Sequence, residues 1–188
     1  SWTAQAEPSS LFSALKVGVK EGWLVSKHDV KGAFLNAKMP EGKIVIVRPP
    51  PLWVEWGLVE KGTLWTLDKT VYGLRESPFL WSQERDARLS ELSWSIGSKA
   101  CSTYYLSRCD SDSQLWRIKQ TGSDAVLGIL VVYVDDFLLQ TKLGPVRDGL
   151  LQALSSVWTL AKEETLTVDH PITFLGIELE LRASGDIF

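Results

Sequence analysis

Two adjacent aspartates, Asp135 and Asp136, interrupt an otherwise apolar stretch at residues 127–139. Burying an unpaired carboxylate costs several kcal/mol even after its surroundings relax. Neighbouring carboxylates also raise each other's pKa unless a positive charge lies between them. A divalent cation is the simplest partner for both groups, and carboxylate oxygens suit Mg²⁺. The pair therefore predicts a metal site.

The same pair has an interpretation that needs no metal. Aspartate tolerates turn geometry, so Asp135 and Asp136 would then form a solvent-facing hairpin turn. Two-residue hairpin turns prefer Asn-Gly or Asp-Gly, and no glycine follows these residues. The local sequence leaves both interpretations open.

A third aspartate, Asp29, ends an apolar segment at residues 23–30 and precedes a tight turn. An aspartate at such a boundary is commonly a helix cap, which remains the alternative. Together, however, Asp29, Asp135 and Asp136 supply the carboxylates that a two-metal phosphoryl-transfer site draws from separate strands. In such a site one metal lowers the pKa of the attacking hydroxyl, and both stabilise the in-line transition state.

Two helices are predicted early in the chain and in its middle. Residues 11–22 carry apolar side chains at helical spacing, and Gly22 can end that helix. Residues 77–92 show the same spacing, and Pro78 suits the first turn. A third helix is predicted at residues 146–154.

The segments that flank the aspartate pair predict an antiparallel hairpin. Residues 126–134 and 137–141 are strand candidates joined at Asp135-Asp136, and the second returns at once without a crossover helix. A receiver domain, which also has an acidic pair and a distant aspartate, needs a parallel sheet and is therefore disfavoured. The other strand candidates are residues 23–30, 43–48, 64–67, 104–106, 115–119 and 173–181.

These elements predict an α+β fold in which an antiparallel sheet is backed by helices. We expect the three aspartates at one edge of the sheet, where a strand end meets a hairpin turn. We expect the helices at residues 11–22 and 77–92 to cover the opposite face.

The composition bounds the function classes. The 188 residues, with 45% hydrophobic side chains, predict one globular domain. No run of about 18 apolar residues exists, so we expect no membrane-spanning helix and no membrane partner. The first ten residues lack a signal-peptide pattern, and Cys101 and Cys109 suggest neither a disulfide framework nor a zinc site. A reducing compartment is the default.

The net charge is unevenly distributed. Its formal value of −3 is unusual for a nucleic-acid binder. The early part of the chain is locally basic, however, which is compatible with phosphate contacts. Its basic residues are Lys16, Lys20, Lys27, Lys31, Lys38, Lys43 and Arg48.

Four motifs, in order along the chain, resemble the reverse transcriptases of copia-type retrotransposons. Residues 29–36, DVKGAFLN, resemble the first catalytic motif, and residues 71–78, VYGLRESP, with Trp81 resemble the YGLKQAPRxW segment. Residues 133–136, YVDD, resemble the polymerase YxDD box, and residues 174–177, FLGI, resemble the strand that follows it. Any one motif alone would be a weak signal; the four in order are specific.

The resemblance implies that residues 1–188 are a reverse-transcriptase palm with partial fingers, cut from a Pol polyprotein and without thumb or RNase H. It implies RNA-directed DNA polymerase activity with two Mg²⁺ ions, or Mn²⁺, held by Asp29, Asp135, Asp136 and the carbonyl of Val30. The implied partners are an RNA or DNA template-primer, dNTPs and the polyprotein's integrase and RNase H. The implied location is a cytoplasmic virus-like particle with access to the nucleus.

The resemblance also assigns substrate-binding positions. Phe34 falls at the steric gate that crowds a ribose 2′-hydroxyl, although a phenylalanine is otherwise a core residue. Tyr72 and Gly73 fall beside the incoming nucleotide, Arg75 near its phosphates, and Tyr133 at the start of the YxDD box. Arg75 has the alternative of a solvated loop side chain.

The sequence departs from the copia pattern at three positions, Ala37, Glu76 and Phe79, where Gly, Gln and Arg are usual. Glu76 brings a negative charge near the implied triphosphate site. The basic finger strands are also not recognised, so we expect weak or no polymerase activity from the isolated chain. The alternative function is a decayed or domesticated domain that keeps the fold as a binding or scaffold module.

Overall fold

Residues 7–97 and 102–187 are described by a computed structural model of the chain. They divide into two units: residues 32–84 form the smaller, and residues 7–31, 85–97 and 102–187 form the larger. Helix α3 (Ser77–Glu91) contributes to both, because the division falls after Glu84. Cys101 lies outside the described residues, so the expectation that Cys101 and Cys109 form neither a disulfide framework nor a zinc site stays a prediction.

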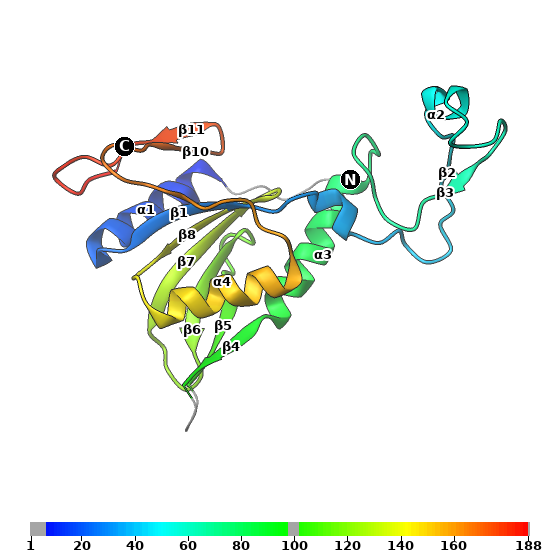
Figure 1. Cartoon of the computed structure of the whole chain (residues 1–188). Helices are drawn as coiled ribbons and strands as arrows, with labels where there is room; N and C mark the ends of the chain where they lie inside the picture. The colour runs from blue at the N-terminus through cyan, green and yellow to red at the C-terminus, as the bar shows by residue number, and fades with distance from the viewer. Residues whose placement is uncertain (1–6, 98–101, 188) are drawn as a thin grey trace. The chain divides into compact units, whose positions relative to one another are not determined.

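The larger unit is built on a seven-stranded sheet in the order β4-β5-β6-β7-β8-β1-β9 (Figure 1). Every neighbouring pair in this sheet is antiparallel, which confirms the predicted antiparallel sheet and contradicts a receiver-type fold. The strands are β1 (Leu24–Asp29), β4 (Ser93–Ile96), β5 (Ser102–Arg108), β6 (Leu115–Gln120), β7 (Val126–Tyr133), β8 (Asp136–Thr141) and β9 (Glu164–Thr165).

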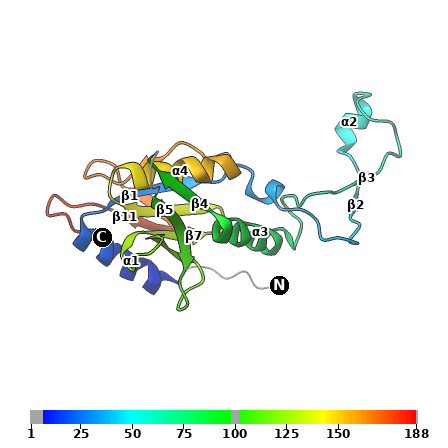
Figure 2. The same ribbon diagram turned by 90° about the horizontal axis from the view of Figure 1, so that it is seen from below.

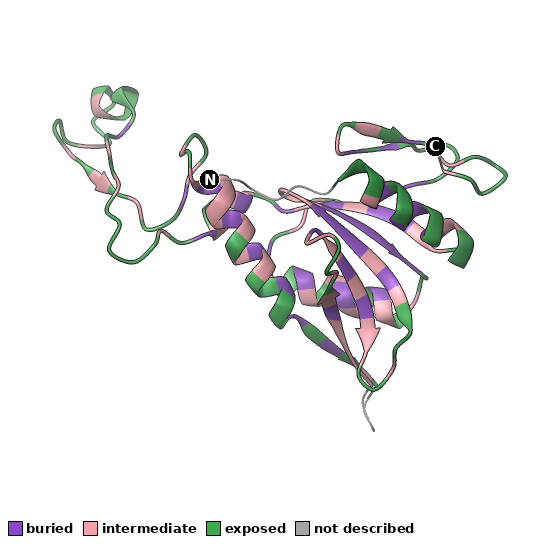
Figure 3. Cartoon of the chain, turned by 180° about the vertical axis from the view of Figure 1, so that it is seen from behind, coloured by how far each residue is buried: buried purple, intermediate pink, exposed green. Residues whose placement is uncertain are grey.

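The centre of the sheet is buried on both faces. Strand β7 is a nearly continuous apolar run and β8 contains the apolar segment Phe137–Leu139; strands covered on both sides need no polar alternation. Figure 3 shows these central strands as mostly buried. Their fully buried apolar side chains are Leu130, Val131, Val132, Phe137, Leu138 and Leu139.

Helices α1 (Pro8–Glu21) and α4 (Pro145–Val157) lie on opposite faces of this sheet (Figure 2). Gly18 of α1 packs closely against the side chain of Gln140, which lies opposite Val25 in the β1–β8 pair. On the other face, Nη2 of Arg147 in α4 donates to Oγ of Ser26, 3.2 Å away. Successive strand residues face opposite sides, which explains how Val25 and Ser26 contact different helices.

Strand alternation places Val25, Lys27 and Asp29 on the α1 face. The expectation that the helix at residues 11–22 covers the face opposite the aspartates is therefore wrong. That helix packs further along the same face, and α4 covers the opposite one. Helix α3 reaches the sheet at the β7–β8 turn, where Nη1 of Arg85 donates to the carbonyl oxygen of Val134 at 2.9 Å.

The predicted first helix is confirmed, although it begins earlier, at Pro8. Proline suits a helix start because its missing N–H would have no helical partner there. Gly22 ends the helix in the left-handed conformation, with φ of 65°, which glycine adopts without a Cβ penalty. The buried stripe of α1 has helical spacing and consists of Leu11, Ala14, Leu15 and Gly18.

The predicted single strand at residues 173–181 is instead a hairpin of β10 (Ile172–Phe174) and β11 (Ile177–Leu179). Leu175 and Gly176 form its turn with φ of 56° and 72°. Positive φ at both central positions is the type I′ pattern, which favours a tight hairpin. The FLGI motif thus spans a turn, and the prediction of a continuous strand was wrong.

The smaller unit contains short elements. Strands β2 (Ile46–Val47) and β3 (Trp65–Thr66) form a two-stranded sheet, which confirms the two strand predictions in shortened form. Between them lies α2 (Pro51–Glu55), which the sequence analysis did not predict. The helical turn η1 (Ala33–Asn36) follows Gly32, which has φ of 61°.

Candidate active site

The β7–β8 turn consists of Val134 and Asp135, because Tyr133 and Asp136 are the last strand pair. The predicted turn at Asp135-Asp136 is therefore displaced by one residue, and Asp136 begins β8. Val134 has φ of 52°, whereas Asp135 is not among the residues with positive φ. Positive φ at the first central position alone is the type II′ pattern. A β-branched residue there carries strain on the order of 1–3 kcal/mol.

The end of β1 lies beside this turn. Asp29 is the partner of Asp136 in the β1–β8 register. The N–H of Val30 donates to the carbonyl oxygen of Asp135 at 3.0 Å, and the carbonyl of Asp29 accepts from the N–H of Ala161 at 2.8 Å. The backbone thus brings a strand end, a turn and a strand start together within the larger unit, each carrying one predicted aspartate.

The side chains of this cluster share an electrostatic environment. Burial raises the pKa of Asp29, and the neighbouring Asp135 raises it further. Burial also raises the pKa of Asp136, which Lys27 partly offsets. Nζ of Lys27 lies 3.3 Å from Oδ1 of Asp136 and 3.9 Å from Oε1 of Glu164. A raised carboxyl pKa means that the ionised form is under-compensated, which a bound cation would correct.

The donor set fits a hard divalent cation in kind. It consists of carboxylate oxygens, which Mg²⁺ prefers, and contains no sulfur or imidazole ligand. In the described ranges, 7–97 and 102–187, no three His, Cys, Asp or Glu side chains are gathered closely enough to hold a metal ion. The structure thus brings the backbone positions of Asp29, Asp135 and Asp136 close together. The way in which their carboxylates would coordinate a metal ion stays a prediction.

Tyr133 precedes the turn and is half-buried. Its ring meets the ring of Phe174 edge to face, with centroids 6.4 Å apart. It belongs to the margin of the apolar core beneath α1. This packing accounts for the tyrosine, so its predicted contact with substrate stays a prediction.

The other predicted substrate residues lie in the smaller unit. The rings of Phe34 and Tyr72 are tilted against each other with centroids 4.8 Å apart. Thr70 donates a hydrogen bond from Oγ1 to the carbonyl of Phe34, which ties η1 to the segment before Tyr72. Tyr72 is 57% exposed, and the next residue, Gly73, has φ of 88°. Substitution of Gly73 would strain that turn.

Arg75 is exposed and lines a hollow of about 380 Å³ together with Pro40, Glu76, Phe79 and Leu80. Glu76, the acidic departure from the copia pattern, forms an ion pair with Lys43. Lys43 therefore offsets part of the negative charge that Glu76 brings to this hollow.

Three residues near the turn were missed as site residues by the sequence analysis. Lys27 lies two residues before Asp29, and the period of a strand would have placed it on the same face. Glu164 pairs with Lys27 across β1 and β9, a contact with no local sequence signal. Arg85 was recognised only as a helical position of the segment 77–92.

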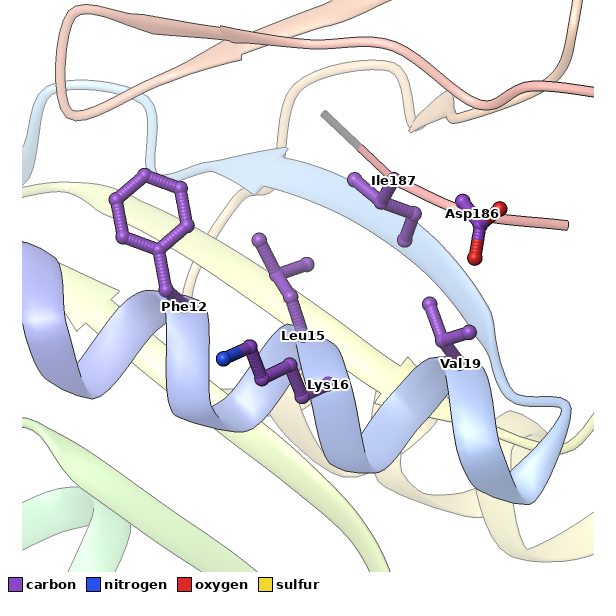
Figure 4. Close-up of a pocket in the computed structure, with 6 residues that line it drawn as sticks. All are labelled: Phe12, Leu15, Lys16, Val19, Asp186 and Ile187. Atoms are coloured by element: carbon purple, nitrogen blue, oxygen red, sulfur yellow. The ribbon is translucent and has the colours of Figure 1, made fainter.

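A second hollow of about 530 Å³ lies away from these carboxylates, in the larger unit. Phe12, Leu15 and Val19 point from α1 toward the segment that carries Ile187 (Figure 4). Its lining is mostly apolar and includes none of the predicted site residues.

No helix among the described residues has both the length and the apolar character that crossing a bilayer requires.

Comparison with known proteins defines the class. A family model described as reverse transcriptase (RNA-dependent DNA polymerase) matches residues 5–187, so the chain belongs to that family. It is similar to a transposon Ty5-1 protein, YCL074W, of Saccharomyces cerevisiae, with 27% identity over 161 residues. It is also similar to the retrovirus-related Pol polyprotein from transposon RE2 of Arabidopsis thaliana, with 27% identity over 180 residues. Within the family, the chain is a reverse transcriptase domain of the copia retrotransposon type.

The chain spans only part of these relatives. The aligned region covers 85% of the chain but 44% of the yeast protein, and 94% of the chain but 10% of the Arabidopsis polyprotein. The matched domain is thus one part of the larger relatives.

Proposed function

We propose that the chain is the catalytic domain of an RNA-directed DNA polymerase, one domain of a retrotransposon Pol polyprotein. It would join a dNTP to a primer 3′-hydroxyl on an RNA or DNA template. The observation that carries the proposal is the register of β1 and β8, which pairs Asp29 with Asp136 beside the turn at Asp135. Family membership supports the same chemistry.

In this proposal Asp29, Asp135 and Asp136 hold two Mg²⁺ ions, with the carbonyl of Val30 as a further ligand. When bound, the metal lowers the pKa of the primer hydroxyl and stabilises charge on the transferred phosphate. The raised pKa values of Asp29 and Asp136 favour this role, because a divalent cation would replace the missing compensation. Lys27 forms an ion pair with Asp136, so its ammonium group would share this carboxylate with a bound metal ion and add to the positive charge of the site.

We assign the nucleotide contacts to the smaller unit. Phe34 would exclude the ribose 2′-hydroxyl, and its contact with Tyr72 would restrict the movement of its ring. Gly73 would allow close approach of the base or sugar. Arg75 would contact the phosphates, with Glu76 neutralised by Lys43.

The larger setting is also part of the proposal, and the similarity to a Pol polyprotein supports the place of the chain within such a polyprotein. The chain would act as palm and partial fingers alongside integrase and RNase H. It would work in a cytoplasmic virus-like particle with access to the nucleus.

A scaffold or binding module without catalysis is the competing proposal. The ion pair between Lys27 and Asp136 favours it, because that pair stabilises the carboxylate without a metal. Phe79, where the copia pattern has Arg, also removes a positive charge from the hollow beside Arg75. Metal binding separates the two proposals.

The test is Mn²⁺ titration of the chain, followed by water-proton relaxation, together with primer extension on an RNA template. The polymerase proposal expects Mn²⁺ binding that Asp135→Asn weakens at least about 10-fold. Asp169→Asn, an exposed aspartate between β9 and β10, is the matched control and should bind as wild type does. A wild-type chain that binds no Mn²⁺ would favour the scaffold. Weak primer extension by the isolated chain is expected and would not decide between them.

A further inference from the structure

Arg85 of α3 is a buried cation with its guanidinium aimed at the β7–β8 turn. Its side chain is 1% exposed. Nη1 donates to the carbonyl oxygen of Val134 at 2.9 Å, and Nη2 donates to Oε1 of Gln114 at 2.7 Å. Gln114 is itself tied to β7, because its carbonyl accepts from the N–H of Val132 at 2.9 Å. Arg85 thus contacts the turn directly and the preceding strand through one intermediary.

The peptide that Arg85 contacts is a strained one. Val134 has φ of 52°, and the β-branched side chain makes this conformation unfavourable without support. The contacts that hold the turn include a hydrogen bond from Arg85 to the carbonyl of Val134 and another from the N–H of Val30 to the carbonyl of Asp135. A strained residue persists only where its surroundings over-determine its conformation.

The cost of burying Arg85 is offset by a specific anion. Oδ1 of Asp86 accepts from Nε at 2.9 Å and from Nη2 at 2.8 Å, and Oδ2 of Asp86 accepts from Arg108 at 2.7 Å. Burial nevertheless lowers the pKa of Arg85, and Asp86 offsets only part of that effect. The planar guanidinium donates in three directions at once, a geometry that lysine cannot reproduce.

We propose that Arg85 is a positioning residue for the polymerase site: by fixing the carbonyl of Val134 it keeps the turn in the conformation that directs the carboxylate of Asp135. Without this hydrogen bond, the peptide at Val134 relaxes toward negative φ and rotates the following residue. The effect on Asp135 rests on the proposed metal-binding function, whereas the effect on the turn does not.

A double-mutant cycle tests this coupling. Glycine adopts positive φ without a Cβ penalty, so Val134→Gly should make the turn less dependent on Arg85. We expect Arg85→Met to weaken Mn²⁺ binding about 10-fold in the Val134 background, and about 3-fold or less in the Val134→Gly background. Arg85→Lys keeps the positive charge but loses the planar set of guanidinium donors. Its Mn²⁺ affinity should therefore lie between those of Arg85→Met and wild type.

Arg108→Met is the matched control. It removes a guanidinium from the same Asp86 carboxylate without touching the turn, so Mn²⁺ affinity should stay within about 2-fold of wild type. Gln114→Met provides a second route if Arg85→Met does not fold, because it removes one acceptor that orients Arg85. We expect it to weaken Mn²⁺ binding in the same direction, and a wild-type affinity would overturn the proposal.

Unfolding measured without metal separates this inference from the proposed function. Arg85→Met should raise the unfolding equilibrium constant in both backgrounds. The increase should be at least about 5-fold smaller when residue 134 is glycine than when it is valine. If wild type binds no Mn²⁺, the polymerase proposal fails, and this coupling still tests whether Arg85 holds the turn. Equal effects in both backgrounds, on unfolding or on Mn²⁺ affinity, would refute the positioning role.

Discussion

Nζ of Lys27 in β1 lies 3.3 Å from Oδ1 of Asp136, the first residue of β8. The same ammonium group lies 3.9 Å from Glu164 in β9, so one lysine spans three adjacent strands. Both partners in the closer pair are less than one quarter exposed, so solvent screens their interaction only in part. Lys27 is therefore placed to compete with any cation that binds Asp136.

Lys27→Met should tighten Mn²⁺ binding about 3- to 10-fold, because it removes a positive charge beside a proposed ligand. Glu164→Gln should weaken binding by a smaller factor, about 2-fold, since that side chain is 50% exposed. Titration at two salt concentrations should show the difference shrinking as salt rises. Lys142→Met, an exposed lysine just beyond β8, serves as the control, and an equal gain there would contradict a local effect.

Asp29 and Asp136 predict the pH dependence of the metal-free protein. Burial raises the pKa of both groups above the unfolded value of about 4. The stability they contribute is therefore fully present below that unfolded pKa and is lost as the pH rises through the raised folded values. Asp29→Asn has no carboxylate to ionise at this position, so it avoids the unfavourable buried charge that wild type carries at neutral pH. Without metal, the variant should therefore be more stable than wild type at neutral pH.

This stability difference should close as the pH is lowered toward 4. Denaturant unfolding in the presence of EDTA at several pH values measures it, and the comparison with wild type cancels the titration of other groups. Saturating Mg²⁺ should reverse the order at neutral pH, because the wild-type site, with all three proposed carboxylate ligands, binds the ion more tightly than the site of Asp29→Asn. A difference independent of pH would contradict the raised pKa of Asp29.

Phe34 predicts a change in sugar selectivity. Phe34→Val removes the ring proposed to crowd a 2′-hydroxyl, so incorporation of ribonucleotides relative to deoxynucleotides should rise about 10- to 100-fold. Steady-state incorporation by a Pol-length protein that is active measures this ratio. Phe34→Tyr keeps the ring and should keep the selectivity. An unchanged ratio in the valine variant would assign Phe34 to packing against Tyr72 alone.

Gly128 in β7 predicts a stability effect unrelated to chemistry. A Cβ there would lie 2.7 Å from the carbonyl oxygen of Gln140 and 2.7 Å from side-chain atoms of Ile118 and Thr141. Alanine favours a strand more than glycine does, yet this crowding should make Gly128→Ala destabilising by about 2–3 kcal/mol. Chemical denaturation measures the change. Val126→Ala, at the exposed start of the same strand, should cost about 0.5 kcal/mol, and equal costs would contradict the crowding.

Elements with a strong local signal were predicted well. Helix α1 shows a buried stripe at helical spacing and ends at Gly22, β7 is a long apolar run, and β8 carries the apolar residues Phe137–Leu139 directly after the aspartate pair. Short elements such as α2 and β9 were not predicted, because their few residues carry no periodicity and their pairing is set by distant parts of the chain. The FLGI segment looked continuous because nothing local marks Leu175 as a residue with positive φ.

The sequence by itself determined the family, through four ordered motifs, and named the aspartates proposed to hold the metal ions. Residue type and order along the chain are enough for that, since a motif is a local property. Only the tertiary structure decided that Lys27 and Glu164 lie near Asp136, and that Arg85 donates a hydrogen bond to the carbonyl of Val134. These contacts join residues far apart in the chain, and their geometry depends on strand register and helix packing, which no local pattern encodes.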